Sequence, residues 1–206
     1  MSGLFITFEG IDGVGKSTQA NLLEEYLRSL GHEVVRTLEP GGTELGQEIR
    51  QLLLHRKGHV AARAEALLFA ADRAHHVETK IKPALAAGSF VISDRYFDSS
   101  VAYQGAGREL SMDEVRHINI WATGGLLPNL TVLLDLDAAA ARARRHTTGT
   151  SEDRIEQAKI EFFEATRKAF LKLAEAEPER FIVIDANQTV DQMQAQIRAR
   201  VNAILG

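Results

Sequence analysis

Short apolar runs alternate with longer amphipathic segments along this chain. The apolar runs cover residues 4–8, 32–38, 90–94, 130–136 and 181–184. Each has the length of a strand, although 32–38 is ragged, and the almost continuously apolar run 130–136 is typical of a strand buried on both faces of a parallel sheet. Helical spacing of apolar side chains predicts helices over 17–30, 44–54, 60–87, 111–122, 138–145 and 190–205, and another whose buried face holds Ile155, Phe162, Thr166, Ala169 and Leu173. This alternation specifies a three-layer α/β domain of about five parallel strands flanked by helices.

The loop after the first apolar run fits the phosphate-binding pattern G-x-x-x-x-G-K-[ST]. It reads Gly10-Ile11-Asp12-Gly13-Val14-Gly15-Lys16-Ser17. The glycines allow successive backbone N–H groups to point into one concavity. Lys16 can reach the outer phosphates of a nucleotide, and the Ser17 hydroxyl can ligate Mg²⁺. A plain Gly-rich turn is the alternative, but the strand, loop and helix here are the context that the motif requires, so we expect a nucleotide site.

The composition is that of one ordinary globular domain. The chain has 206 residues, of which 45% are hydrophobic and 25% charged, and we expect a single domain over 1–206. A net charge of −4 provides no basic surface for nucleic acid, and the lack of cysteine excludes disulfides and thiolate chemistry. No apolar run is long enough to span a membrane, and the opening strand leaves no room for a signal peptide. We therefore expect a cytoplasmic protein.

Ligands of open parallel sheets bind beyond the carboxyl ends of the strands. Asp94 ends the third apolar run, where P-loop proteins hold Mg²⁺ through water; a turn or helix cap is the alternative. Arg95 follows it, and a cation buried there needs an anionic partner such as a phosphate. One or two helical turns later lies a polar cluster suited to a base or a sugar: Ser99, Ser100, Tyr103 and Gln104.

Two helical segments carry further candidates. Phe69 and Arg73 share one helix face, where a ring and a guanidinium can stack on a base and bond to its edge. The alternative is a core phenylalanine beside a surface charge. A polar stretch over 146–153 can act as a lid that presents an arginine to a phosphoryl group, or it can simply follow an exposed basic helix end. The arginines that flank it are Arg142, Arg144, Arg145 and Arg154.

The pair His75-His76 lies on the same long helix as Phe69. No nearby acid or histidine has the spacing of a metal site, so we interpret both residues as solvated or capping side chains. Capping is also predicted for Thr43, after the turn at 39–42, and for Ser111 with Glu114 three residues on.

Five segments together resemble the thymidylate kinase family, in the order in which that family carries them. They are Phe8–Gln19, Glu39–Thr43 with Ile49-Arg50, Leu68–Arg73, Asp94–Gly105 and Asp153–Glu156. The resemblance covers nearly the whole chain. It implies the P-loop nucleoside monophosphate kinase fold and ATP-dependent phosphorylation of dTMP to dTDP with Mg²⁺. It also implies a homodimer; the apolar helix faces around 60–87 and 111–124 can supply the interface, although a buried core explains them equally well.

The resemblance further implies roles for residues at matching positions. The phosphates of ATP would be bound by Gly10, Ile11, Asp12, Gly13, Val14, Gly15, Lys16, Ser17 and Thr18, with Ser17 and Asp94 toward the metal. The acceptor dTMP would be bound by Asp12, Phe69, Arg73, Arg95, Ser99, Ser100, Tyr103 and Gln104. Phe69 would stack on thymine, Arg73 would bond the base edge, and Tyr103 would stand where a 2′-hydroxyl projects.

The phosphate loop of this chain differs from that of some family members in the residue that would supply the catalytic cation. Some members carry an arginine inside the phosphate loop, whereas this loop has Asp12-Gly13-Val14. The resemblance then implies that a lid over about 145–154 supplies the cation, beside Lys16, Arg95 and Asp12. Residues 147–152 contain no arginine, which makes Arg154 the first candidate and Arg145 the second.

Two other classes of function compete with this interpretation. One is another nucleoside monophosphate kinase, for UMP, dUMP or AMP, against which the Phe69/Arg73 pair and the Tyr103-Gln104 cluster weigh. The other is a P-loop nucleotide-binding switch that works through partners. The chain has no Asn-Lys-x-Asp motif for reading guanine, which weighs against a switch.

Overall fold

The computed structural model describes residues 3–108, 110–147, 154–155 and 158–206, and of 145–147 only the backbone. Over these residues, five strands form one parallel sheet in the order β2-β3-β1-β4-β5. They are β1 (Phe5–Glu9), β2 (Val34–Leu38), β3 (Phe90–Asp94), β4 (Leu130–Asp135) and β5 (Phe181–Asp185). Each coincides with a predicted apolar run, and the predicted fold class is confirmed.

Helices connect the strands, and several continue into wider π-helical turns. The described α-helices are α1 (Lys16–Ser29), α2 (Glu44–Arg50), α3 (Ala62–His76), α4 (Lys82–Ala86), α5 (Phe97–Ser100), α6 (Met112–Thr123), α7 (Ala138–Thr147), α8 (Ile160–Ala176) and α9 (Val190–Leu205). The π-helical segments are η1 (Gln51–His55), η2 (Val77–Ile81) and η3 (Val101–Gly107). No helix of the described residues has the length and apolarity needed to cross a membrane.

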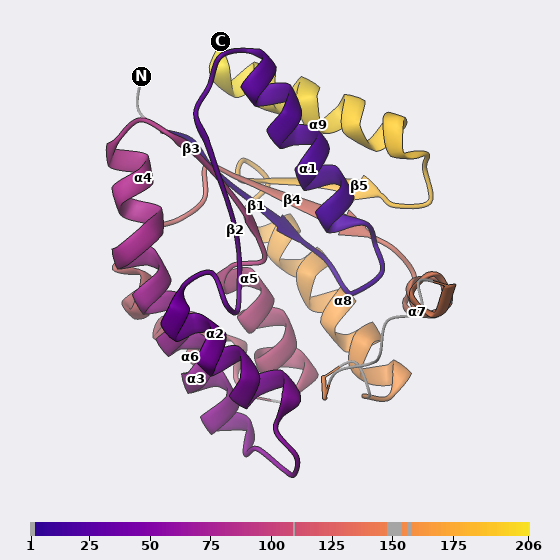
Figure 1. Ribbon diagram of the computed structural model, residues 1–206. Coiled ribbons are helices and arrows are strands. Elements are labelled where there is room, and N and C mark those ends of the chain that lie inside the picture. The colour runs from indigo at the N-terminus through magenta and orange to yellow at the C-terminus, as the bar shows by residue number, and fades with distance from the viewer. Residues whose placement is uncertain (1–2, 109, 148–153, 156–157) are drawn as a thin grey trace.

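The elements form three layers around the sheet (Figure 1). Helices α1 and α9 cover one face, and α5 and α8 lie on the other. Helices α2, α3 and α6 gather beyond the sheet on the side of α5. Because β1 lies between β3 and β4, the loop that follows it opens at the centre of the carboxyl edge. That edge is where ligands of such sheets bind.

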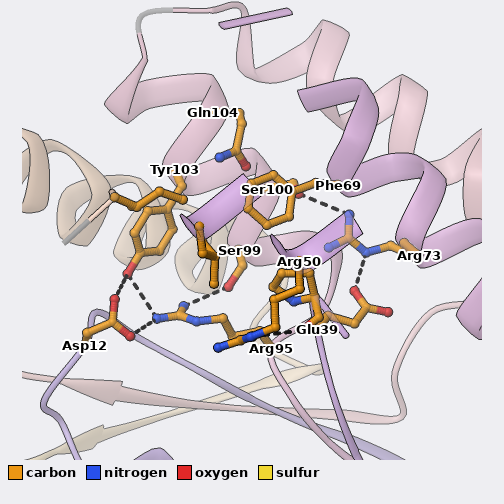
Figure 2. Close-up of a pocket in the computed structure, with 13 residues that line it drawn as sticks. Asp12, Glu39, Arg50, Phe69, Arg73, Arg95, Ser99, Ser100, Tyr103 and Gln104 are labelled. Carbon is orange, nitrogen blue, oxygen red and sulfur yellow. Dashed lines mark hydrogen bonds and ion pairs between the residues drawn. The ribbon is translucent and has the colours of Figure 1, made fainter. Parts of the chain in front are cut away.

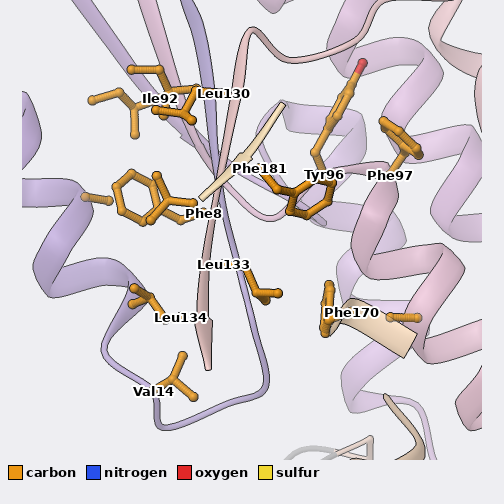
Figure 3. Packing of buried hydrophobic residues seen from close by; sticks show 14 of the residues in the cluster. Phe8, Val14, Ile92, Tyr96, Phe97, Leu130, Leu133, Leu134, Phe170 and Phe181 are labelled. Carbon is orange, nitrogen blue, oxygen red and sulfur yellow. The ribbon is translucent and has the colours of Figure 1, made fainter. Parts of the chain in front are cut away.

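The core lies on both faces of the sheet. Alternate residues of a strand point to opposite faces, so Leu133 and Leu134 of β4 pack on opposite sides, as Figure 3 shows. Leu133 faces Phe170 of α8, and Leu134 lies on the side of Phe8 and the phosphate loop. Burial on both faces explains the nearly continuous apolar runs. It also makes β1 a rigid base for the loop that follows.

Both predicted N-caps are present, but at Ser111 the described hydrogen bonds do not include the return bond from the Glu114 side chain that would complete a capping box. The Thr43 hydroxyl accepts a hydrogen bond from the Gly46 amide at 3.0 Å, and the Ser111 hydroxyl accepts one from the Glu114 amide at 3.3 Å. The long helix predicted over 60–87 is α3, η2 and α4 in succession, and Pro83 lies in the first turn of α4. Proline is tolerated in the first turn of a helix because it has no N–H group to leave unbonded there.

One predicted helix was partly wrong. Helix α8 begins at Ile160, after Lys159 in an extended conformation, so Ile155 does not belong to it. Its buried face includes the predicted Thr166, Ala169 and Leu173, but Phe163 is buried there while Phe162 is only half-buried. Starting the helix at residue 160 leaves Ile155 in irregular chain, where its side chain packs against a cavity described below.

Candidate active site

The loop between β1 and α1 has the curled backbone that its motif predicts. Gly10, Gly13 and Gly15 have φ angles of 129°, 91° and 96°, in a region that L side chains rarely adopt. A side chain at Gly10 would also collide with the carbonyl oxygen of Leu134. Helix α1 begins directly afterwards, at Lys16, and directs its positive dipole end toward the loop. The backbone here is therefore arranged for an anion.

Lys16 is buried beside this loop. Its ammonium group donates to the carbonyl oxygens of Gly10 at 3.1 Å and Ile11 at 3.0 Å, and lies 3.6 Å from a carboxylate oxygen of Asp12. Burial, followed by the charge of Arg95, lowers the pKa of Lys16. A phosphate entering the loop would meet an ammonium group that the loop already orients.

The pair Ser17 and Asp94 lies at the mouth of the loop. The Ser17 hydroxyl donates to Asp94 Oδ2 at 2.8 Å, because β3 pairs with β1 and brings Asp94 alongside. Hydroxyl and carboxylate oxygens are ligands that Mg²⁺ accepts. The described residues contain no cluster of three or more acidic, histidine or cysteine side chains that would hold a metal alone. This sparse oxygen set fits Mg²⁺, which usually keeps waters and takes substrate phosphates as its other ligands.

A wide cavity opens over the phosphate loop. Besides Asp12–Gln19 and Asp94, it is lined by Leu38, Glu39, Arg50, Arg95, Arg144, Gln188, Thr189, Val190 and Met193. The sequence interpretation assigned no role to 188–190. These residues follow β5, so the rule that ligands bind past the ends of parallel strands was the signal for them.

A second, more enclosed cavity adjoins the first (Figure 2). It is lined by Asp12, Glu39, Pro40, Arg50, Leu54, Phe69, Arg73, Arg95, Ser99, Ser100, Tyr103, Gln104 and Ile155. All eight residues predicted for the acceptor are in this set. The sequence analysis assigned no role in the acceptor site to the other five, Glu39, Pro40, Arg50, Leu54 and Ile155. Asp12, Glu39, Arg50 and Arg95 line both cavities, so the two spaces meet at these side chains.

Arg95 connects the phosphate loop to the second cavity. Its Nη2 donates to Asp12 Oδ1 at 2.6 Å and to the Tyr103 hydroxyl at 3.1 Å, and its Nη1 donates to Ser99 at 2.9 Å and Gly10 at 3.0 Å. Its φ of 73° is unusual for a residue with a side chain. Such strained residues cluster at functional sites. Figure 2 shows Asp12, Tyr103 and Arg95 converging on one side of the cavity.

Arg73 lies on the opposite side and is fully buried, so the alternative of a surface charge is wrong. Its Nε donates to Glu39 Oε2 at 2.7 Å. Its other hydrogen bonds go to Ser100, the amide oxygen of Asn119 and the carbonyl oxygen of Tyr96. These bonds hold the guanidinium at one orientation on the cavity wall beside Phe69, which is 9% exposed.

The interpretation of His76 as solvated or capping was wrong. Its ring is completely buried, with Nδ1 2.8 Å from Glu39 Oε1 and Nε2 2.6 Å from the Thr37 hydroxyl. Both partners come from β2 and its end, which the local sequence around His76 does not reveal. His76 therefore supports Glu39, which in turn holds Arg73.

Glu9 is a positioning residue that the sequence analysis did not single out. It ends β1, is fully buried, and accepts hydrogen bonds from the Tyr96 amide at 2.8 Å and the Ser99 hydroxyl at 2.5 Å. Burial, together with the nearby charge of Asp98, raises the pKa of Glu9 to about 8. Its place directly before the loop was the available signal.

The predicted lid over 145–154 falls largely outside the described residues. The Arg145 side chain lies outside them. Arg154 is described, and its contacts are with η1 and α3: Nε donates to the Leu53 carbonyl oxygen at 2.8 Å, and Nη2 bonds to Glu65. It contributes to neither of the two cavities above. The structure thus does not bring Arg154 to the phosphate loop, and its catalytic role stays a prediction.

A phosphate loop at the centre of a parallel sheet, adjoining a second cavity with an aromatic ring and arginines, defines a P-loop nucleoside monophosphate kinase. Comparison with known proteins narrows this class. The sequence model of the family Thymidylate kinase matches residues 8–197. This chain belongs to the thymidylate kinase family.

Individual relatives match over nearly the whole of this chain. A thymidylate kinase of Clavibacter sepedonicus is 60% identical over 205 residues, covering 100% of this chain and 97% of the relative. One from Bifidobacterium longum subsp. infantis is 54% identical, covering 100% of this chain and 88% of the relative. The crystal structure of thymidylate kinase from Ehrlichia chaffeensis superposes with a TM-score of 0.82 at 32% identity, covering 98% of this chain and all of that one.

Proposed function

We propose that this protein transfers the γ-phosphoryl group of ATP to the 5′-phosphate of dTMP, giving ADP and dTDP. The observation that carries the proposal is the junction of the two cavities. Asp12, Glu39, Arg50 and Arg95 line both, so a donor on the phosphate loop and an acceptor beside Phe69 would meet end to end. The names of the relatives, at 60% identity over the full chain, support dTMP as the acceptor.

The donor side is served by the loop and by Lys16. The loop amides and the α1 dipole would hold the phosphates of ATP, with Lys16 against the outer ones. Ser17 and Asp94 would hold Mg²⁺, which when bound neutralises developing charge on the phosphate oxygens. The metal is expected with ATP, as in phosphoryl transfer generally.

The acceptor side is served by Phe69, Arg73 and Arg95. Phe69 and Arg73 would bind the base by stacking and by its edge, while Arg95 and Arg50 offer cations at the junction for the acceptor phosphate. An oxygen of that phosphate forms a bond to the γ-phosphorus as the bond to the ADP oxygen breaks. Because the acceptor is already a dianion near neutral pH, no strong general base is required. Catalysis then rests on positioning and on charge neutralisation.

A panel of acceptors tests the proposal. ADP formation from Mg-ATP is measured with dTMP, dUMP, UMP, dCMP and AMP at equal concentrations. We expect the highest kcat/KM with dTMP. Equal rates across the panel would contradict the choice of dTMP, and turnover of AMP or UMP in preference would favour the competing kinase class.

We also propose that the protein acts as a homodimer. Leu67 on α3 is 56% exposed and Trp121 on α6 is 84% exposed. Leu67 lines a groove between α3 and α6. Its other lining residues are the apolar Ala66, Leu110, Val115 and Ile118 and the polar Arg63, Glu114 and His117. Such exposed apolar side chains on adjacent helices are typical of a partner surface. The cytoplasmic location stays a prediction from the sequence.

A further inference from the structure

A buried carboxylate lies next to the second cavity, which we call the acceptor cavity because dTMP is proposed to bind there. Glu65 lies on α3, one helical turn before Phe69, and its side chain is 1% exposed. Three side chains donate to it: Gln104 Nε2 at 3.1 Å, Arg108 Nε at 3.2 Å, and Arg154 Nη2. Gln104 lines the acceptor cavity, whereas Glu65 does not. Glu65 therefore touches the site only through other residues.

The charge of Glu65 is secured by these partners. Burial alone would raise the pKa of Glu65, but the hydrogen bonds from Arg154 and Gln104 and the charge of Arg108 together lower it. An ionised carboxylate can only accept hydrogen bonds. Whatever faces it must be a donor.

This constraint orients the amide of Gln104, which has one donor end and one acceptor end. Glu65 takes the NH₂ end, which leaves the carbonyl oxygen for the cavity. In Figure 2 the amide oxygen of Gln104 lies on the side of Phe69, and the nitrogen is turned away from it. A ligand at Phe69 thus meets an acceptor at Gln104.

We propose that Glu65 is a positioning residue that fixes the polarity of Gln104, and that this polarity selects a pyrimidine with an imide N–H, thymine or uracil, over cytosine. The inference rests on the proposed function, in which Phe69 and Gln104 face the base. Thymine and uracil carry a hydrogen at N3 that the Gln104 oxygen can accept. Cytosine presents a lone pair at N3, and two acceptors then face each other. A site with a buried polar group left unpaired rejects such a ligand strongly.

The test compares substrate ratios in Glu65→Gln, Gln104→Leu and the double variant. A glutamine at 65 can donate as well as accept, so the Gln104 amide is free to reverse. We expect the ratio of kcat/KM for dTMP over dCMP to fall about 10-fold or more in each single variant, mainly through KM, with no further fall in the double variant. Arg73 still reads the other edge of the base, so part of the discrimination survives.

Two controls distinguish a reversed Gln104 amide from general damage to the binding site. The ratio of dTMP over dUMP should stay unchanged in every variant, because both bases carry the imide N–H. Arg108→Met removes another partner of Glu65 but leaves the bond to Gln104, so it should keep the dTMP over dCMP ratio of the unmodified protein. A change of both ratios together in Glu65→Gln would overturn the proposal.

Other results would contradict either the role proposed for Glu65 or the proposed function. A folded Glu65→Gln with an unchanged dTMP over dCMP ratio contradicts the inference. If that variant fails to fold, an unchanged ratio in Gln104→Leu contradicts it equally. If the unmodified protein does not phosphorylate dTMP, the proposed function has failed. Calorimetric binding of dTMP and dCMP to the same variants then still tests Glu65, with the ratio of Kd values in place of kcat/KM.

Discussion

Charged side chains that are buried or half-buried around the acceptor cavity form ion pairs with one another. Arg95 is bonded to Asp12, Arg73 to Glu39, and Arg154 to Glu65. An isolated buried charge is costly, whereas a paired one that is also hydrogen-bonded can be kept at a fixed position. The pairs therefore orient the groups that would read the acceptor, and removing one member of a pair would leave the other uncompensated.

Lys16 gives a direct prediction at the scale of one residue. Lys16→Ala should lower kcat by about 10²-fold or more, because it removes a positive charge from the phosphates in the transition state. The Kd for dTMP should change little, since Lys16 lines only the cavity over the phosphate loop. Steady-state kinetics and calorimetry measure the two effects. The exposed Lys172→Ala serves as control, and near-normal turnover in Lys16→Ala would refute the role given to Lys16.

Asp72 gives a second prediction, on stability and pH. Its side chain is completely buried on α3; Oδ1 accepts from the Gly41 amide at 3.1 Å, and Oδ2 has no hydrogen-bond partner among the described residues. Burial, then repulsion from Glu39, raises the pKa of Asp72 to about 6, against an ordinary 3.8. The folded protein thus retains a proton that the unfolded chain releases, so the free energy of unfolding falls as the pH rises from about 4 to about 6.

Asp72→Asn removes this ionisation. We expect the variant to be more stable than the unmodified protein above pH 6 by about 1–3 kcal/mol, and the difference to vanish toward pH 4. Urea unfolding between pH 4 and pH 8 measures it. Arg73 and His76 also interact with this carboxyl group, and both stay unchanged in the variant. A stability difference that is constant across the pH range would contradict the assignment to Asp72.

Residues with local motifs were predictable, and residues whose role depends on distant partners were not. The phosphate loop follows from its own eight positions, because each has a backbone or chemical reason. The burial of His76 depends on Thr37 and Glu39, which are 39 and 37 residues away in sequence. Glu65 is likewise distant in sequence from its partners, 39 residues from Gln104 and 89 from Arg154. Nothing in a local pattern indicates such contacts.

At the scale of elements, periodic segments were predicted well because burial on two faces or on one helix face leaves a strong pattern. The strands at Phe5–Glu9 and Leu130–Asp135 are examples. The error at Ile155 has the opposite origin. Its spacing suits a helix that includes α8, but its side chain is buried against the acceptor cavity and the chain there is irregular. An apolar residue in a loop is indistinguishable from a helical one by spacing alone.

Helix α9 gives a prediction at this scale. Thr189 caps it: its hydroxyl accepts from the Gln192 amide at 3.3 Å, and the Gln192 side chain accepts from the Thr189 amide at 3.0 Å. Thr189→Ala should lower the free energy of unfolding by about 1 kcal/mol. Thr189 also lines the cavity over the phosphate loop, so the KM for ATP should rise while that for dTMP stays constant. Thr189→Ser should restore the stability, and a failure to do so would contradict the capping account.

At the scale of the whole molecule, the fold brings residues that are distant in sequence together around two adjoining cavities. The cavity over the phosphate loop uses residues 12–19 and 188–193, and the acceptor cavity uses α3, η3 and Ile155. A parallel sheet makes this possible, because every strand delivers the following loop to the same edge. The exposed apolar groups on α3 and α6 lie outside both cavities.

The proposed dimer through α3 and α6 would cover these groups, and it makes the last prediction. Light scattering with size-exclusion chromatography should give twice the 22.7 kDa chain mass for the unmodified protein. Leu67 and Trp121 are 56% and 84% exposed in the single chain, and the proposed partner would bury both. Leu67→Arg or Trp121→Arg would then place a charge in the interface, so either should shift the protein to a monomer. Leu30→Arg, at a comparable 50% exposure beyond α1, should leave the dimer intact. A monomeric unmodified protein, or dissociation by Leu30→Arg alone, would show that this face is not the interface.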